Sequence, residues 1–417
     1  MFIIYAYLIV IFIRPQDWIP AMLAFPIADV VIGGGLLTAI FNLANRRQSI
    51  MAAQSYLLIF YLVTIFLSNA VHGNMPVALD QFMFFFKRAA TFLIFLSVLT
   101  SVKRVRKTLN FYVFLSVLLV FQGIYQSRNG IGLAGQALVQ GSRICWVGMW
   151  DGPNVLALVF VLAATVVAAD IIEQRSSLRR AGAFAFGVIL TYGIYLTNSR
   201  GGFIGLIVGI FSVLIFKMRN KKKAISLGVV IVFIFLVFLS PSRMGEIKGE
   251  TSAHERTWIW ERGLALLRSN PLLGIGRGQF HAVYQEVAHN NLVQDAAEMG
   301  FVGLFLFIGI MYSSFKGLFH LQKSDYSKTM KEWPELKSLC QALLAGLVAF
   351  NVTTFFITMN LDLLYVWWAL CAVPLVIIRK NNGIAFPGFN KKDMAMVACI
   401  MIFALAGIWV IAAKNLV

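Results

Sequence analysis

The stretch VLALVFVLAATVVAADII occupies residues 155–172, and its one charged side chain, Asp170, lies near its end. At a rise of 1.5 Å per residue it forms a helix about 27 Å long, close to the thickness of the hydrocarbon core of a bilayer. Similar apolar runs recur along the chain, and short basic or Gly/Pro-containing segments separate them. This pattern predicts helices that span a membrane.

Composition supports the same fold class. The chain has 417 residues, of which 59% are hydrophobic and 13% charged, and its mean hydropathy is +0.78. One water-soluble core cannot hold so much apolar surface. We therefore expect an all-α, polytopic membrane helix bundle of about 12 to 13 transmembrane helices, forming a single integral membrane domain over residues 1–417. The expected spans are 2–13, 21–43, 51–68, 89–100, 109–125, 155–172, 181–196, 202–216, 224–239, 299–319, 339–359, 363–378 and 394–413.

The basic residues predict the orientation of this bundle, because Lys and Arg in short loops stay on the cytoplasmic side. They gather at residues 46–47, 103–107, 175–180, 217–223, 316–337 and 379–392. The N-terminus is then cytoplasmic, and the loops after Leu67 and Tyr125, the turn at Arg200 and the long loop 240–298 lie on the opposite face. The net charge of +18 is distributed over juxtamembrane clusters that suit anionic membrane lipids, so we expect no nucleic-acid partner.

The long loop 240–298 is the most charged external segment. Residues 252–269 predict an amphipathic helix on the outer membrane interface, with Trp258, Leu264 and Leu267 on one face. Asn290 is suited to cap a helix that continues into the span starting near Met299. A small helical loop region therefore stands outside the membrane.

Two arginines in these external segments are candidates for binding an anion. Arg200 lies in the run NSRGG at 198–202, where two glycines and a helix start let backbone amides approach an anion. Arg256 precedes Arg262 on the expected loop helix. Two arginines from separate loops can bind both phosphates of a pyrophosphate, because each guanidinium donates to two oxygens at once. The alternatives are an interfacial Arg200 and solvated charges on the loop helix.

His289 is the candidate proton acceptor. It lies in AHNNLVQ at 288–294, before a helix that enters the bilayer, and imidazole titrates near neutral pH. A solvated histidine near a helix cap is the alternative. His281 is the nearest rival as the base and His254 a weaker one, because both lie on more exposed stretches of the same loop. We see no paired carboxylates, no metal-ligand spacing and no CxxC pairing among the four cysteines, so we expect no metal and no cofactor.

Taken in order, these motifs resemble the O-antigen ligase and polymerase superfamily. The resemblance rests on NSRGGF at 198–203, Arg256 with its two tryptophans, NPLLGIG at 270–276, His289-Asn290 and EMG at 298–300. Residues 143–154, ending in Pro153-Asn154, also resemble an earlier external loop of that family. The similarity covers roughly residues 143–319.

The resemblance implies a metal-independent, inverting glycosyltransferase in the bacterial inner membrane, with its active site facing the periplasm. Its donor would be a glycan on undecaprenyl pyrophosphate, and its acceptor a hydroxyl of lipid A core. Arg200 and Arg256 would bind the pyrophosphate, and His289 would act on the acceptor hydroxyl. Secondary candidates are Arg143, Asn198 and Arg262, and Arg243 or Arg262 could replace Arg256 as the second phosphate ligand. The segment 256–289 is short for the family, which leaves the acceptor open.

Other functions fit parts of the same pattern. A polymerase of O-antigen or exopolysaccharide repeat units uses the same donor chemistry, and a protein-glycosylating relative needs more external room than these loops offer. A transporter of an anionic or lipid-linked substrate would carry ionisable or broken positions deep within several spans. Asn351 is the clearest polar residue in the middle of an expected span.

Overall fold

The computed structural model describes residues 1–45, 52–173, 176–238, 251–355, 357–358, 362–383 and 388–413. Over these residues the protein is helical, and β-pairing is limited to two isolated bridges in the loop after Asn129. The all-α prediction is therefore confirmed. Eleven described helices are long and apolar enough to cross a membrane, compared with the twelve or thirteen expected.

The chain divides into two compact units, each built from separate stretches of sequence. Unit 1 comprises Met1–Ile40, Val98–Ile247 and Leu318–Thr354, and unit 2 comprises Phe41–Ser97, Lys248–Gly317 and Phe355–Val417. Unit 1 contains α1 (Phe2–Phe12), α2 (Pro15–Trp18), η1 (Pro20–Met22), most of α3 (Ile27–Ala44), α6 (Val102–Asn129), η2 (Gly148–Trp150), α7 (Pro153–Glu173), α8 (Ser177–Thr197), α9 (Arg200–Lys217), α10 (Lys221–Phe238) and α14 (Trp333–Thr354). Unit 2 contains α4 (Ala53–Ala70), α5 (Met75–Val98), α11 (Thr251–Ser269), α12 (Gln279–Tyr284), most of α13 (Asn291–Lys323), α15 (Asp362–Asn382) and α16 (Lys391–Ala413).

In unit 1, α7 is the central helix. Its residues from Leu156 to Val167 are buried, and α6, α8, α9 and α14 pack around it. Small residues on α9 permit this close packing, since a Cβ at Gly209 would lie 2.7 Å from the hydroxyl of Thr165 on α7 and 3.0 Å from Ala349 on α14. The apolar run that predicted the fold therefore forms the core of this unit.

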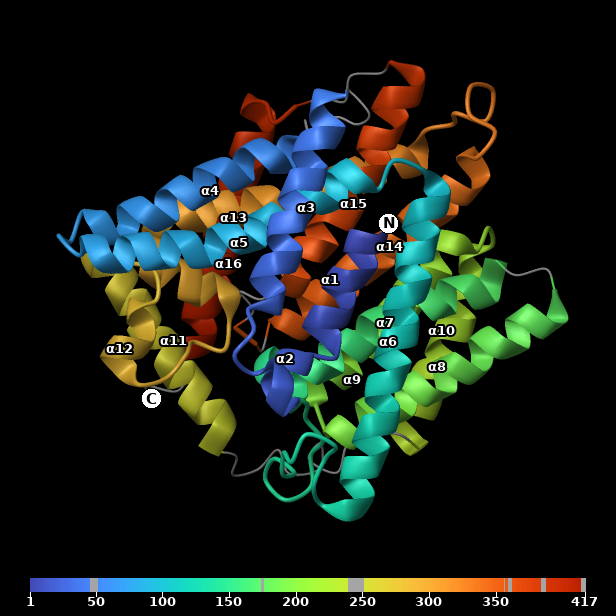
Figure 1. Cartoon of the computed structure of the whole chain (residues 1–417), viewed down its shortest axis with the longest axis horizontal. Helices are drawn as coiled ribbons and strands as arrows, with labels where there is room; N and C mark the ends of the chain where they lie inside the picture. Colours follow the sequence, from blue (N-terminus) through green and yellow to red (C-terminus); the bar gives the residue numbers. More distant parts are fainter. Residues whose placement is uncertain are drawn as a thin grey trace. The chain divides into compact units, whose positions relative to one another are not determined.

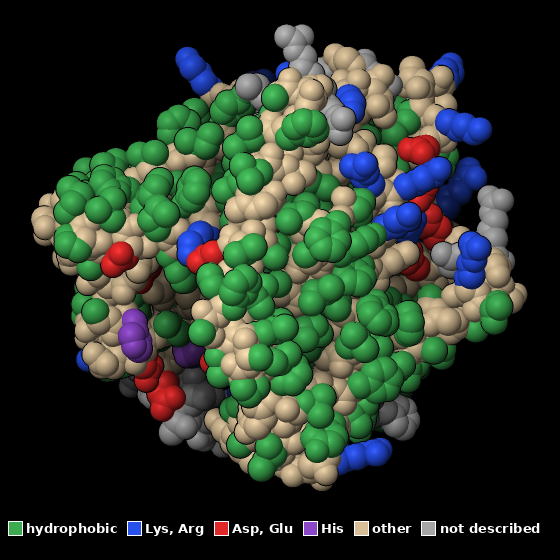
Figure 2. Space-filling model, in the orientation of Figure 1, with side chains coloured by type: hydrophobic (Ala, Val, Ile, Leu, Met, Phe, Trp, Pro, Cys, Tyr) green, Lys and Arg blue, Asp and Glu red, His purple; other side chains and the backbone are tan. Residues whose placement is uncertain are grey.

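An ion-pair cluster joins four helix ends at one side of unit 1. Arg106 at the start of α6 contacts Asp170 at 2.5 Å and Glu173 at 3.1 Å, and Lys217 at the end of α9 lies 3.1 Å from Glu173. Glu335 at the start of α14 lies 3.6 Å from Arg106. Figure 2 shows several Lys and Arg side chains gathered beside acidic ones at the upper right of the view, and hydrophobic side chains over much of the rest of the face. The segments 103–107, 217–223 and 316–337, which were expected on one side of the membrane, therefore lie close together at this cluster. The compartment that they face stays a prediction.

Unit 2 is built around α15, whose residues from Leu363 to Ile378 are almost entirely buried. Trp368 of α15 contacts Phe307 of α13 with ring centroids 5.8 Å apart. The helices α4 and α5 run side by side (Figure 1), and the rings of Phe66 and Phe82 are in edge-to-face contact with centroids 6.2 Å apart. α5 begins at Met75 rather than at residue 89, because Arg88 is accommodated in the helix: it lies over the Phe84 ring and 3.8 Å from Asp362 of α15.

Two other expected spans differ from the structure. α1 has only 11 residues, too few to cross a bilayer, although Ile4, Leu8 and Phe12 are fully buried. α10 has 18 residues, and the three lysines at its start leave a described uncharged stretch that is shorter than a typical span. These two helices account for the difference between the predicted and the observed number of spans.

α13 is broken at Gly300, which has φ 64° and ψ −162°. The amides of the next two residues instead donate to the loop before α12: Phe301 N to Pro271 O at 2.7 Å and Val302 N to Leu272 O at 3.3 Å. A Cβ at Gly300 would lie 2.4 Å from the Leu272 backbone. The glycine therefore lets the NPLLG loop dock on α13, and the break requires no unpaired amide at these two positions.

Candidate functional site

Arg200 is the first residue of α9. The helix before it ends at Thr197, and Asn198 turns the chain with φ 48°. The Oγ of Ser199 then caps α9 by accepting from Gly202 N at 3.1 Å. Because the positive end of the α9 dipole lies at this terminus, the half-buried Arg200 adds a second positive charge there, and the two together favour an anion.

Arg143 supports this helix start from the loop before α7. Its Nε donates to Thr197 O at 2.9 Å and its Nη2 donates to Asn154 Oδ1 at 2.7 Å. Ser199 also donates to Asn154 Oδ1, at 2.8 Å. The ends of α8 and α9 and the start of α7 are therefore joined by one buried polar cluster, formed by Arg143, Asn154, Thr197 and Ser199.

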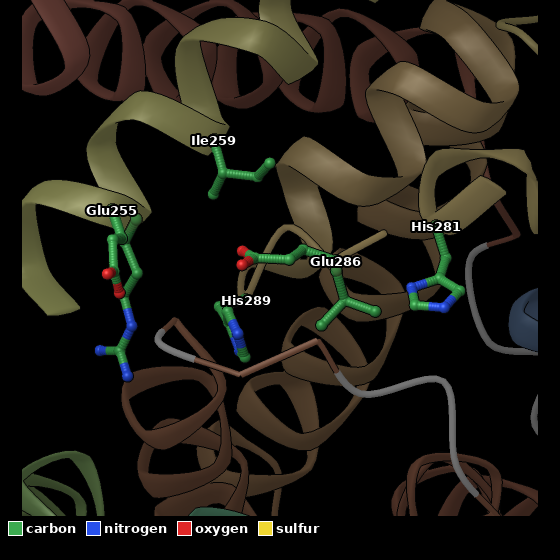
Figure 3. Close-up of a pocket in the computed structure, with 7 residues that line it drawn as sticks. Glu255, Ile259, His281, Glu286 and His289 are labelled. Atoms are coloured by element: carbon green, nitrogen blue, oxygen red, sulfur yellow. The ribbon is translucent and has the colours of Figure 1, made fainter. Parts of the chain in front are cut away.

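Unit 2 contains a cavity of about 420 Å³ beside α11. Its walls combine acidic, basic and imidazole side chains with two apolar ones: Glu255, Arg256, Ile259, His281, Glu286, Val287 and His289. Figure 3 shows Glu255 and Ile259 on α11, with Glu286 and His289 reaching the same hollow from the loop after α12. Arg256 and His289, predicted from separate motifs, therefore line one cavity.

His289 has a left-handed backbone, with φ 50°. The pKa of its imidazole lies below the ordinary value of 6.5, mainly because burial disfavours the charged form and further because Arg256 is positive; the Glu286 carboxylate acts in the opposite direction. A lowered pKa keeps the ring neutral, and able to accept a proton, at neutral pH.

The helix α11 positions Arg256 by burying its other face. Trp260, Leu264 and Leu267 are buried, and the Trp260 indole contacts Phe355 with ring centroids 5.6 Å apart. Trp258 was expected on this face but is 48% exposed. The spacing explains the difference, because residues 260, 264 and 267 follow the i, i+4, i+7 pattern of one helix face.

A buried ion-pair network fixes the loop between α11 and α13, and sequence analysis missed it. Arg277 is 2% exposed and pairs with Asp295 and with Glu298, whose Oε2 lies 3.3 Å from Nε. Tyr61 of α4 donates to Asp295 at 3.1 Å. The available signal was the spacing of the two carboxylates, which are three residues apart and therefore on one face of α13.

Other predicted residues have varied positions. The Arg262 guanidinium lies 3.5 Å from the Trp258 ring centroid and 5.1 Å from that of Tyr284. His281 lines the cavity, whereas Arg243 and the side chain of His254 lie outside the described residues. Asn351 donates to the backbone of its own helix, at Leu347 O. Within the described part of the chain, no group of three or more His, Cys, Asp or Glu side chains could hold a metal ion.

A comparison with protein families matches residues 185–308 to the family described as O-antigen ligase. The matched segment extends from α8 into α13 and includes Arg200, Arg256 and His289, whereas Arg143 precedes it. The chain thus has the helices of a multi-pass membrane protein, and its residues 185–308 are similar to the O-antigen ligase family.

Two bacterial relatives agree with this assignment. A Rickettsia typhi protein named "putative polysaccharide ligase" is 22% identical over 223 residues, which cover 48% of this chain and 51% of the relative. A Rickettsia felis protein with the same description is 21% identical over 235 residues, covering 50% of this chain and 54% of the relative. The chain therefore spans about half the length of the curated relatives that it matches.

Proposed function

We propose that the protein is a glycosyltransferase that moves a glycan from undecaprenyl pyrophosphate to an acceptor hydroxyl at the periplasmic face of the inner membrane, as an O-antigen ligase does with lipid A core. The observation that carries this proposal is the cavity shared by Arg256 and His289, within a segment of the O-antigen ligase family. It combines a cation for a phosphate with a neutral base for a hydroxyl.

In the proposed reaction, Arg200 and Arg256 bind the pyrophosphate of the donor. Their charges stabilise the negative charge that develops on the leaving group, so the bond between the anomeric carbon and the pyrophosphate breaks without a metal or a nucleotide. The acceptor oxygen forms the new bond to that carbon from the opposite side, which inverts its configuration. His289 takes the hydroxyl proton, and undecaprenyl pyrophosphate leaves.

The secondary candidates have different roles in this proposal. We infer that Arg143 positions Arg200 rather than binding phosphate, because two of its donor groups already bond to Thr197 and Asn154. Asn198 forms the turn before Arg200. Arg262 is the weaker alternative to Arg256, because its guanidinium lies against two aromatic rings.

The proposal is tested with purified protein in lipid nanodiscs, supplied with a glycan on undecaprenyl pyrophosphate and with lipid A core. We expect one glycan transferred per acceptor and release of undecaprenyl pyrophosphate in equal amount. A ladder of lengthened lipid-linked glycans would instead identify a polymerase. A second assay uses the same protein in sealed vesicles. Uptake of the donor into their lumen, with no new glycosidic bond, would contradict the proposed enzyme and favour a transporter.

A further inference from the structure

The two residues that flank His289 are fixed by buried hydrogen bonds. The Ala288 amide donates to Gln294 Oε1 at 2.8 Å, and the Ala288 carbonyl accepts from Trp260 Nε1 at 2.9 Å. On the other side, Asn290 Oδ1 accepts from Leu292 N at 2.8 Å. Asn290 also donates from Nδ2 to Phe355 O at 3.1 Å.

These bonds hold His289 in a backbone conformation that it would otherwise leave. A non-glycine residue at φ 50° is strained and persists where its surroundings over-determine it. The bonds of Ala288 and Asn290 supply that constraint at both sides. Rotation of His289 to negative φ would redirect its ring relative to the cavity wall.

Gln294 connects this constraint to the buried ion pair. Its Nε2 donates to Glu298 Oε1 at 2.7 Å, and the other carboxylate oxygen of Glu298 pairs with Arg277 at 3.3 Å. All three side chains are buried. The amide orientation of Gln294 is thereby set, since its nitrogen must face the carboxylate and its oxygen the Ala288 amide.

We propose that Gln294 and Trp260 are positioning residues. Gln294 holds the amide of Ala288 and Trp260 holds its carbonyl, and together they aim the His289 imidazole at the acceptor hydroxyl. Neither side chain touches the substrate in this inference. It rests on the proposed role of His289 as the base, and it adds two residues that act through His289 on the turnover step.

The test measures kcat and the KM for the donor of Gln294→Leu and Trp260→Phe, each alone and combined with His289→Ala. Alone, Gln294→Leu and Trp260→Phe should each lower kcat by about 10- to 100-fold and leave KM within about twofold, because a misaimed group slows the chemical step. Combined with His289→Ala, neither should cause more than about a twofold further loss, since the group that it aims is absent.

Matched controls use the same residue types elsewhere in unit 2. Gln54 is a buried glutamine of α4 that donates to Ser314 at 3.4 Å, and Trp258 is an exposed tryptophan of α11. Gln54→Leu and Trp258→Phe should each keep kcat within about threefold of the natural protein.

The outcomes separate this inference from the proposed function. If Gln294→Leu and Trp260→Phe both keep full turnover while His289→Ala loses it, the positioning role is overturned and His289 remains the base. Equal losses with and without His289 would show that the side chains support the fold rather than His289. Normal turnover of His289→Ala would contradict the base itself and this inference with it. If Gln294→Leu does not fold, Trp260→Phe decides, because it keeps an aromatic ring at this position and removes the indole donor.

Discussion

Arg143 donates a 2.7 Å hydrogen bond to the side-chain oxygen of Asn154, and that oxygen also accepts from the Ser199 hydroxyl that caps α9. The loop before α7 is thereby connected to the helix start that carries Arg200. This connection brings together two motifs that lie far apart in sequence, at 143–154 and 198–203.

Removal of Arg143 should therefore disturb Arg200 indirectly. We expect Arg143→Ala to lower stability by about 1–3 kcal/mol, since it removes two hydrogen bonds of a buried guanidinium, and to weaken donor binding. Arg143→Lys should recover only part of both losses, because one ammonium cannot reproduce the two directed bonds of the guanidinium. Thermal unfolding and donor affinity, measured in nanodiscs on the same samples, check this. Undiminished stability would contradict the structural role.

The two proposed pyrophosphate ligands should be individually essential. Arg200→Ala and Arg256→Ala should each abolish transfer in a deletion strain while the protein remains folded in the membrane. The corresponding lysine variants should restore little activity, since Lys lacks the planar fork of donors. Glycan transfer is read from lipopolysaccharide on gels, and expression level is the control. Near-normal transfer by either alanine variant would remove that residue from the donor site.

The pH dependence of turnover should report the charges around His289. Only the neutral imidazole accepts a proton, so turnover should fall as pH drops through the pKa, which already lies below 6.5 because of burial and Arg256. The Glu286 carboxylate raises that pKa, so Glu286→Gln should lower it further and move the acidic limb to lower pH. Glu255 and His281 also line the cavity, and Glu255→Gln is the comparison. A shift to higher pH in Glu286→Gln would contradict the assignment.

Transfer should not require a divalent metal ion, because the cationic charge for the leaving group is supplied by arginine in our proposal. We expect equal initial rates in EDTA and in magnesium for purified protein. Loss of activity in EDTA with recovery in magnesium or manganese would require a metal at the donor phosphates.

The sequence was sufficient for most of the helices and for the positions of Arg200 and His289 next to helix boundaries. The apolar run at 155–172 predicted a span, and it is the buried centre of unit 1. Arg200 was recognisable because Ser199 and two glycines indicate a helix start. His289 was recognisable because Asn290 indicates the next one.

Tertiary contacts explain what the sequence did not reveal. Arg277 lies between two glycines in a loop, a context typical of an exposed charge, and its burial depends on carboxylates of α13 and on the Phe85 ring of α5. Arg88 stands directly before the expected start of this span at residue 89 but lies within α5, where a cation–π contact and Asp362 accommodate it. His289 has a left-handed backbone between two residues that are held by distant partners. Ala288 bonds to Gln294 and Trp260, and Asn290 bonds to Phe355, contacts that no local pattern encodes.

The central claim is that His289 removes the proton from the acceptor hydroxyl. The most direct test measures donor affinity and single-turnover rate side by side for His289→Ala, with His281→Ala as the neighbouring histidine control. We predict that His289→Ala slows transfer by about 10²- to 10⁴-fold, the usual contribution of a positioned base, and changes donor affinity by less than about twofold. Normal transfer by His289→Ala, or a collapse of its donor affinity, would contradict this role.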